Sequence, residues 1–158
     1  LAGITSTYVK LTQLATETTS GIAQVATQTE VNAGTDDTKI VTSKKLKALF
    51  AGSNVNFGVN GYEKLPNGLI RQWGWSAIPA IPSGIGSSVE QTINFPITFP
   101  NSCLSVNITG TADSGDDGLE ALNSAAYRDR NKVIVRSYRM VGTYNGTPGS
   151  VCWQAIGY

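Results

Sequence analysis

The sequence predicts a mainly β protein in two parts, a short β/α segment over residues 1–58 and an antiparallel β-sandwich over residues 59–158. Three observations lead to this fold class. The chain of 158 residues is rich in Thr, Ser, Asn and Gly, and only 15% of it is charged, a composition that suits pleated strands joined by turns. Turn signals recur in the second part, and a short repeat occupies the first.

The repeat lies near the start of the chain, where QLATET at Gln13 returns as QVATQT at Gln24. Between the two copies, residues 21–26 alternate apolar and polar positions as a short strand does. Repeats this short cannot bury an apolar face alone and must stack on neighbours or on other chains.

Two short helices are expected after the repeat. Thr27 or Thr29 is placed to cap a helix through residues 31–33, with Gly34 as its stop. A second helix is expected over residues 44–50, where apolar residues recur on one face. The whole part has too few large apolar residues for a monomeric domain, so we interpret it as a stalk that associates with other chains.

The second part alternates turn signals with short apolar runs, the pattern of an antiparallel sandwich. The expected strands are 69–75, 89–95, 104–108, 132–138 and 151–156. Cys103 and Cys152 each lie in such a run, and we expect both to be buried free thiols.

Composition excludes several classes of function. Histidine is absent, which removes Ser-His-Asp and Cys-His catalysis and every His-based metal site. The net charge of +1 argues against a nucleic-acid partner. The longest basic cluster, Lys44, Lys45 and Lys47, is short, and we interpret it as a solvated helix face rather than a binding patch. No apolar run is long enough to span a membrane, so membrane insertion is not expected. We expect no cofactor.

Several motifs resemble those of phage tail fibres. The run ATETTSGIAQVAT from Ala15 resembles a shaft element of these fibres, and VTSKKL from Val41 resembles the segment that commonly follows it, with Ser43 in place of the usual Pro. In the second part, GYEKLPNGLI from Gly61 and the closing WQAIGY resemble the knob that ends many such fibres. The similarity extends to tail fibres of contractile-tailed phages, including ones that infect Acinetobacter.

This resemblance implies a parallel homotrimer with an intertwined shaft and a β-sandwich knob at the fibre tip of a virion. The implied partners are the rest of the phage fibre and baseplate and a bacterial surface glycan, either capsule or lipopolysaccharide. A third hypothesis is a purely structural fibre segment whose true tip lies elsewhere. We expect instead that the chain end at Tyr158, which carries the knob motif, forms the tip.

An enzyme is the rival hypothesis, a small glycan depolymerase that would use two carboxylates of one loop. The candidate carboxylates are Asp113, Asp116, Asp117 and Glu120. Turn formation accounts for acidic residues in such a Gly- and Ser-rich loop, so we do not expect catalysis. The same loop fails the calcium-binding template at two ligand positions, Gly115 and Ser124, and no metal is expected.

Sugar binding needs an aromatic face and planar polar groups, which residues near strand ends and in loops of a rigid sandwich can provide. The receptor-binding candidates are Trp75, Tyr127, Arg128, Tyr138, Arg139, Tyr144 and Asn145. An intersubunit ion-pair patch is an equal alternative for the cluster from Tyr127 to Arg130. Trp73, Trp153 and Tyr158 are expected to be structural.

Overall fold

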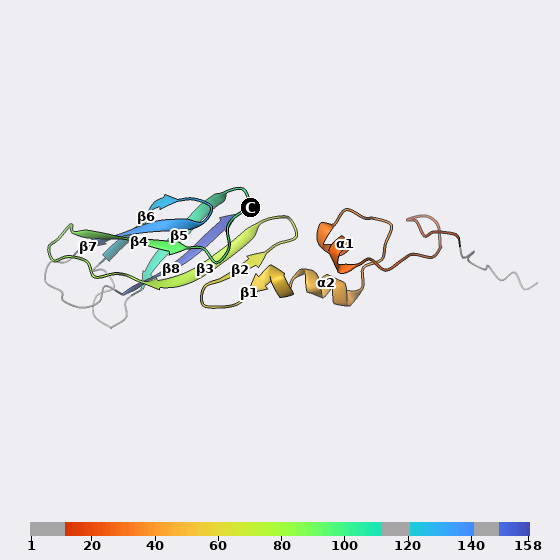
Figure 1. The fold of residues 1–158 in the computed structure, drawn as a ribbon, viewed down its shortest axis with the longest axis horizontal. Helices are drawn as coiled ribbons and strands as arrows, with labels where there is room; N and C mark the ends of the chain where they lie inside the picture. The colour runs from red at the N-terminus through yellow and green to blue at the C-terminus, as the bar shows by residue number, and fades with distance from the viewer. Residues whose placement is uncertain (1–11, 112–120, 141–148) are drawn as a thin grey trace, which may run out of the picture. The chain divides into compact units, whose positions relative to one another are not determined.

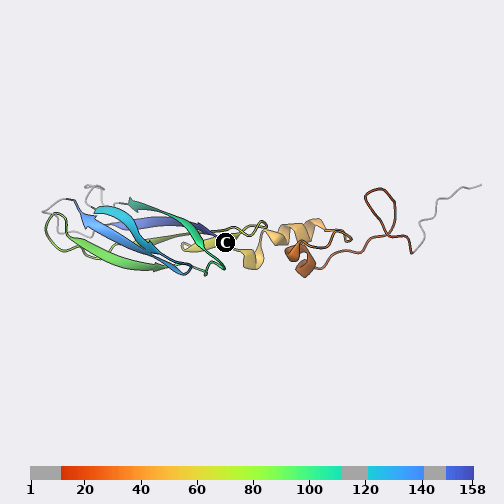
Figure 2. The ribbon, with the colours of Figure 1, turned by 90° about the horizontal axis from the view of Figure 1, so that it is seen from above.

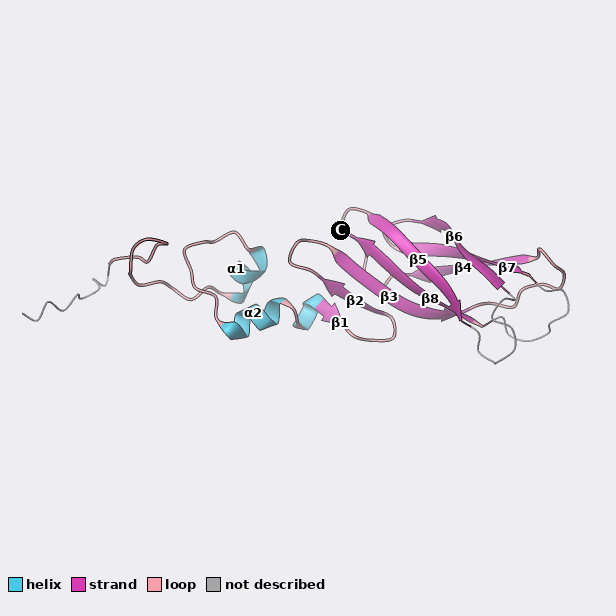
Figure 3. Ribbon diagram, turned by 180° about the vertical axis from the view of Figure 1, so that it is seen from behind, coloured by secondary structure: helices cyan, strands magenta, loops and turns pink. Residues whose placement is uncertain are grey.

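The structure, a computed structural model, describes residues 12–111, 121–140 and 149–158. Its contacts divide the chain into two units, Leu1–Gly52 and Ser53–Tyr158. Figure 3 shows that helix is confined to the first unit and the junction, whereas strands make up the second. Within the described ranges, no helix has the length and apolar character needed to cross a bilayer.

Both predicted helices of the first unit are confirmed. Helix α1 spans Gln28–Ala33 and α2 spans Ser43–Leu49. The Thr27 side chain and Glu30 form a reciprocal capping box at the start of α1, and Gly34 ends the helix in the left-handed region at φ 64°. Local contacts therefore define both ends of this six-residue helix, side-chain hydrogen bonds at its start and the Gly34 backbone at its end. The helix is too short to be stable through its own backbone hydrogen bonds alone.

The repeat produces two equivalent crossings of the chain rather than the predicted strand. Leu14 forms an isolated parallel bridge with Ile22, and Val25, at the same position of the second copy, forms one with Ile40. The two copies form the same two backbone hydrogen bonds. The residue after the bridge position donates its N–H to the partner segment at 3.0 Å, and the carbonyl oxygen of the residue before it accepts from that segment at 2.8 Å. A single bridge cannot propagate into a sheet, so residues 21–26 stay irregular apart from these contacts.

Polar contacts hold the first unit together. Ala26 is its only buried apolar residue among those described. Lys45 donates from Nζ to the Ala26 carbonyl oxygen, and Lys39 lies between the carboxylates of Glu30 and Asp36. These contacts, chiefly the hydrogen bonds from Lys39 and the Thr27 backbone, lower the pKa of Glu30 from 4.5 to about 2.

The second unit is a two-layer β-sandwich (Figures 1 and 2). One sheet has the order β1-β2-β3-β8-β5 and the other β4-β7-β6, with antiparallel neighbours throughout. The strands are β1 Val55–Asn56, β2 Gly61–Lys64, β3 Ile70–Ala77, β4 Ser88–Asn94, β5 Cys103–Thr111, β6 Ala121–Arg128, β7 Lys132–Arg139 and β8 Ser150–Gly157. This confirms the predicted fold class and its five strands, and adds β1, β2 and β6.

Trp153 of β8 lies at the centre of the sandwich core. Its ring is 5.5 Å from that of Phe95, which follows β4 in the opposite sheet, and Phe95 in turn meets Phe99 edge-on at 5.3 Å. Gly74 on β3 leaves the space that the Trp153 ring fills, since a Cβ there would lie 2.5 Å from it. Fully buried aliphatic side chains such as Val135 complete the packing from the second sheet.

The expectation that both cysteines are buried is wrong for Cys152. Cys103 is buried, and desolvation raises the pKa of its thiol. Cys152 is exposed, because residues of β8 alternate between the two sides of the sheet and Cys152 occupies an outward position next to the inward Trp153. Both thiols are free.

Arg139 is buried at the end of β7, although it was expected in a binding loop. Its guanidinium donates to the carbonyl oxygens of Ile81 at 2.7 Å and Pro82 at 2.9 Å. The backbone of Arg139 also bonds to Ser87 and Gly86. The side chain therefore fixes the connection between β3 and β4.

Acid is expected to unfold the first unit through Glu30. Its pKa is lowered in the folded state, so the stabilisation is complete above 4.5 and is lost as pH falls from there toward 2. NMR titration of the Glu30 carboxyl carbon and of the α1 amides would follow both events. A Glu30 titration midpoint near 4.5 would contradict the capping and ion-pair contacts.

Arg139→Met is expected to lower the free energy of unfolding of the sandwich by about 1.5–3 kcal/mol, because the buried hydrogen bond to the Ile81 carbonyl oxygen and the partly buried one to that of Pro82 lose their charged donor. Chemical denaturation monitored by tryptophan fluorescence would measure the change. Arg71→Met is the matched control, since its ion pair with Glu63 is largely exposed and should contribute less than about 1 kcal/mol. Equal effects of the two substitutions would refute the structural role of Arg139.

Candidate functional site

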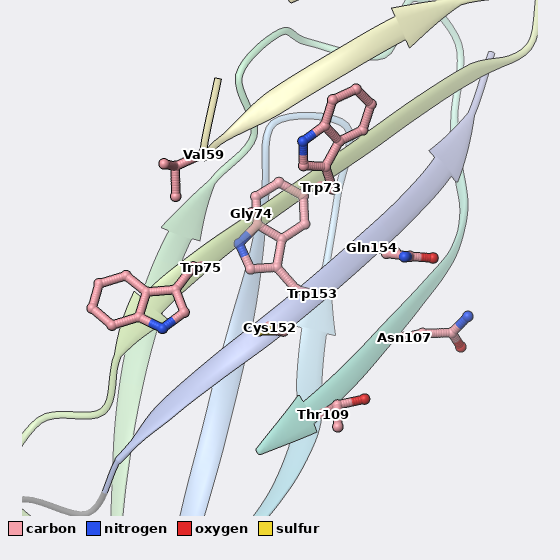
Figure 4. Close-up of a pocket in the computed structure, with 9 residues that line it drawn as sticks. All are labelled: Val59, Trp73, Gly74, Trp75, Asn107, Thr109, Cys152, Trp153 and Gln154. Carbon is pink, nitrogen blue, oxygen red and sulfur yellow. The ribbon is translucent and has the colours of Figure 1, made fainter. Parts of the chain in front are cut away.

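The outward face of the five-stranded sheet carries an open depression over β3, β8 and β5. Its volume is about 490 Å³. Figure 4 shows the residues that line it: Val59, Trp73, Gly74, Trp75, Asn107, Thr109, Cys152, Trp153 and Gln154. We refer to it as the tryptophan depression.

Strand register places its side chains in two rows across the sheet. Trp73 pairs with Gln154, which pairs with Asn107. Trp75 pairs with Cys152, which pairs with Thr109. In both rows a tryptophan lies at the β3 side and a small polar residue at the β5 side (Figure 4). Neighbouring strands are about 4.8 Å apart, so each row spans about 10 Å.

Trp73 is held rigidly at one end of the depression. Its indole Nε1 donates to the Gly58 carbonyl oxygen at 3.2 Å, and Phe57 stacks on its ring with a centroid distance of 6.5 Å. Gly61 lies beneath the ring, where a Cβ would be 2.6 Å from it. Asn60 accepts a 2.8 Å hydrogen bond from the Trp75 backbone, so the loop before β2 is attached to β3 at two points.

The remaining polar groups of the depression are available to a ligand. Within the part of the chain that the structure describes, the side chains of Asn107, Thr109 and Gln154 have no hydrogen-bond partner, and all three are exposed. The Trp75 side chain is 45% exposed and likewise unpartnered there. An exposed aromatic plane opposite free amide and hydroxyl groups can bind a ligand that has both an apolar face and hydroxyl groups.

A second depression of about 410 Å³ continues along the same face toward the chain end. It shares Trp73 and Gln154 with the first and is also lined by Phe57, Arg71 and Ile156. Arg71 forms an ion pair with Glu63 at 2.5 Å, and the two opposite charges cancel.

The other predicted site residues do not join Trp75. Tyr127 and Tyr138 lie on the outward face of the three-stranded sheet, where Tyr127 pairs with Ile134 and the Tyr138 hydroxyl accepts from Arg136 at 3.3 Å. Arg128 donates to the Leu104 carbonyl oxygen at 3.0 Å and so links β6 to β5. Arg139 is buried, and Tyr144 and Asn145 lie outside the described residues.

Of the polar and aromatic residues that line this candidate site, the sequence predicted Trp75 but not Asn107, Thr109 and Gln154. These residues are ordinary polar positions of two strands that are distant in sequence, and only the strand order β3-β8-β5 brings them together. Two-residue alternation within each strand was the available signal, because it places Trp73, Trp75 and Gln154 on outward positions once the inward residues are known.

The described residues do not bring three or more His, Cys, Asp or Glu side chains into one potential metal site. The carboxylates Asp113, Asp116, Asp117 and Glu120 lie outside the described residues. Of those described in the sandwich, Glu63 and Glu90 are ion-paired with arginines, and Asp129 accepts from the backbone of Asn131 and Lys132.

Comparison with known proteins places this fold. The family model described as "Putative tail fiber protein gp53-like, C-terminal" matches residues 64–158. An uncharacterised protein of Methanocaldococcus jannaschii, MJ0347, is 34% identical over 103 residues, which cover 63% of this chain and 63% of that protein. The chain thus spans less than two thirds of the length of this relative.

Solved structures of pyocin tail fibres share the fold. An N-truncated R1-type pyocin tail fibre matches with a TM-score of 0.56 and 22% identity, over 73% of this chain and 93% of that one. A C-terminal fragment of the R1 pyocin fibre of P. aeruginosa matches with a TM-score of 0.59 and 18% identity, over 91% of this chain and 40% of that one. With the family model covering more than half of its residues, the chain belongs to the gp53-like tail fibre family, and its place is the tail fibre of a virion.

Proposed function

We propose that the chain is a non-catalytic trimeric adhesin at the tip of the tail fibre, which binds a bacterial surface polysaccharide, capsule or lipopolysaccharide. The observation that supports glycan binding is the tryptophan depression, where the exposed Trp75 lies across the sheet from the free side-chain groups of Asn107 and Thr109. Sugars present an apolar C–H face and a rim of hydroxyl groups, and this pairing of side chains complements both.

The exposed apolar side chains of the first unit support trimerisation through the stalk. They are Leu14, Ile22, Val25, Ile40, Val41, Leu46 and Phe50, each at least 41% exposed. A unit of this size with so little burial gains most from association with further chains, which would cover these residues. Three identical knobs on one stalk would bind a repeating polysaccharide with high avidity even where each site is weak.

Two of the described carboxylates of the sandwich, Glu63 and Glu90, are not arranged as a catalytic pair. Glu63 and Glu90 each form an ion pair with an arginine, and they lie on different sheets. A glycosidase requires two facing carboxyl groups that are free to exchange protons or attack the sugar. The rival depolymerase would therefore depend on the loop carboxylates Asp113, Asp116, Asp117 and Glu120, which lie outside the described residues.

Trimerisation is expected to give a solution mass three times the chain mass of 16.7 kDa. Light scattering coupled to size exclusion would measure it. Leu46→Asp should weaken association, because it introduces a charge where we expect an apolar contact between chains. A single-chain mass for the unchanged protein at micromolar concentration would refute the trimer.

Purified fibre is expected to bind host cells and their extracted polysaccharide without releasing reducing ends. Fluorescently labelled protein and a reducing-sugar assay on the same samples would score both properties. Polysaccharide from a strain to which the fibre does not adsorb is the control. Release of oligosaccharides would overturn the adhesin and support the depolymerase, with Asp113, Asp116, Asp117 and Glu120 as the residues to substitute.

A further inference from the structure

We propose that the tryptophan depression binds uncharged sugar units of the polysaccharide, with one unit stacked on Trp75 and the hydroxyl groups of this unit and its neighbours in the glycan chain bonded to Asn107, Thr109 and Gln154. This deepens the proposed function by assigning the site and the chemical class of its ligand, and it rests on that function. Three properties of the depression favour such a ligand: its charge, the spacing of its side chains and its rigidity.

Charge selects against an acidic sugar. Among the residues that the structure describes, no charged side chain lines the tryptophan depression. A carboxylate bound there would lose water without gaining a cationic partner, which is unfavourable. The arginine that lines the adjoining depression, Arg71, already forms an ion pair with Glu63. Amide and hydroxyl groups remain as the recognition elements, and these suit the hydroxyl or acylamino groups of a neutral sugar.

Spacing suits a short run of sugar units rather than a small ion. The Trp75 row and the Trp73 row are two residues apart on β3, about 7 Å. The second depression extends the face by a further row, since it shares Trp73 and Gln154 and reaches Ile156. A glycan chain that follows β3 would therefore pass from the Trp75 platform over Gln154 toward Ile156.

Rigidity lowers the entropic cost of binding. Trp73 is fixed by Gly58 and Phe57, and Asn60 ties the loop before β2 to the backbone of Trp75. A tryptophan has two side-chain torsions, so ordering Trp75 against a sugar ring costs less than ordering a long flexible side chain. The Trp73 ring and the backbone of Trp75 are thus held in place before the ligand arrives.

Substitutions within the full chain test where the sugar binds. Trp75→Ala and Asn107→Ala are each expected to weaken binding of extracted host polysaccharide by roughly tenfold, and Trp75→Phe should restore part of the loss. Tyr127→Ala is the matched control, because Tyr127 is a similarly exposed aromatic residue on the other sheet. Loss of binding in Tyr127→Ala alone would overturn the assignment of the site.

Folding of each variant would be checked by its thermal midpoint. Asn107→Ala and Gln154→Ala remove side chains without a hydrogen-bond partner among the described residues, so they should fold normally even where Trp75→Ala does not. Normal binding by both folded variants would contradict the proposed contacts.

Chemical reduction of the polysaccharide carboxyl groups to alcohols tests the class of sugar. Binding of the unchanged protein is expected to stay within about twofold after this reduction, and also between about 0.05 and 0.5 M salt, because no ion pair forms at the site. A loss of tenfold or more on reduction would overturn the neutral-sugar assignment. The proposed adhesin function would be contradicted by different results, namely no binding to either the native or the reduced polysaccharide, or release of reducing ends.

Discussion

Pairing of β8 with β3 on one side and β5 on the other is the constraint on which the sandwich and its outward face depend. In this register, each inward residue of β8 enters the core and each outward residue joins a row across the sheet. Trp153 packs against Phe95 of the opposite layer, while its neighbour Gln154 lies between Trp73 and Asn107. A register slip of one residue would exchange the core and the candidate site.

Those parts of the fold that depend on local signals could be predicted from the sequence. Thr27 and Gly34 mark the ends of α1 through hydrogen bonds and backbone geometry that involve only nearby residues. Strand β6 escaped prediction because its sequence, ALNSAAYR, lacks a regular apolar alternation, and because it pairs with β7 alone in its sheet. Residues 21–26 do alternate, yet among the described residues they form only isolated bridges, which do not extend into a sheet.

Prediction of the site was limited in the same way, because local signals are visible in the sequence whereas contacts between distant strands are not. Trp75 stood out as an aromatic residue at a strand end, but its partners on β5 and β8 become neighbours only through the strand order. Arg139 had the composition of a binding-loop residue and is buried instead, because the carbonyl oxygens of Ile81 and Pro82 offer acceptors at the end of β7. Burial of this kind depends on a connection far away in the sequence.

NMR of the full chain with a fragment of host polysaccharide would show where the sugar binds, because side-chain N–H groups report on each face of the sandwich separately. We expect shifts in the Trp75 indole and in the Asn107 and Gln154 amides as fragment is added. We expect no shifts in the backbone amides near Tyr127. Shifts confined to the three-stranded sheet would contradict sugar binding at the tryptophan depression.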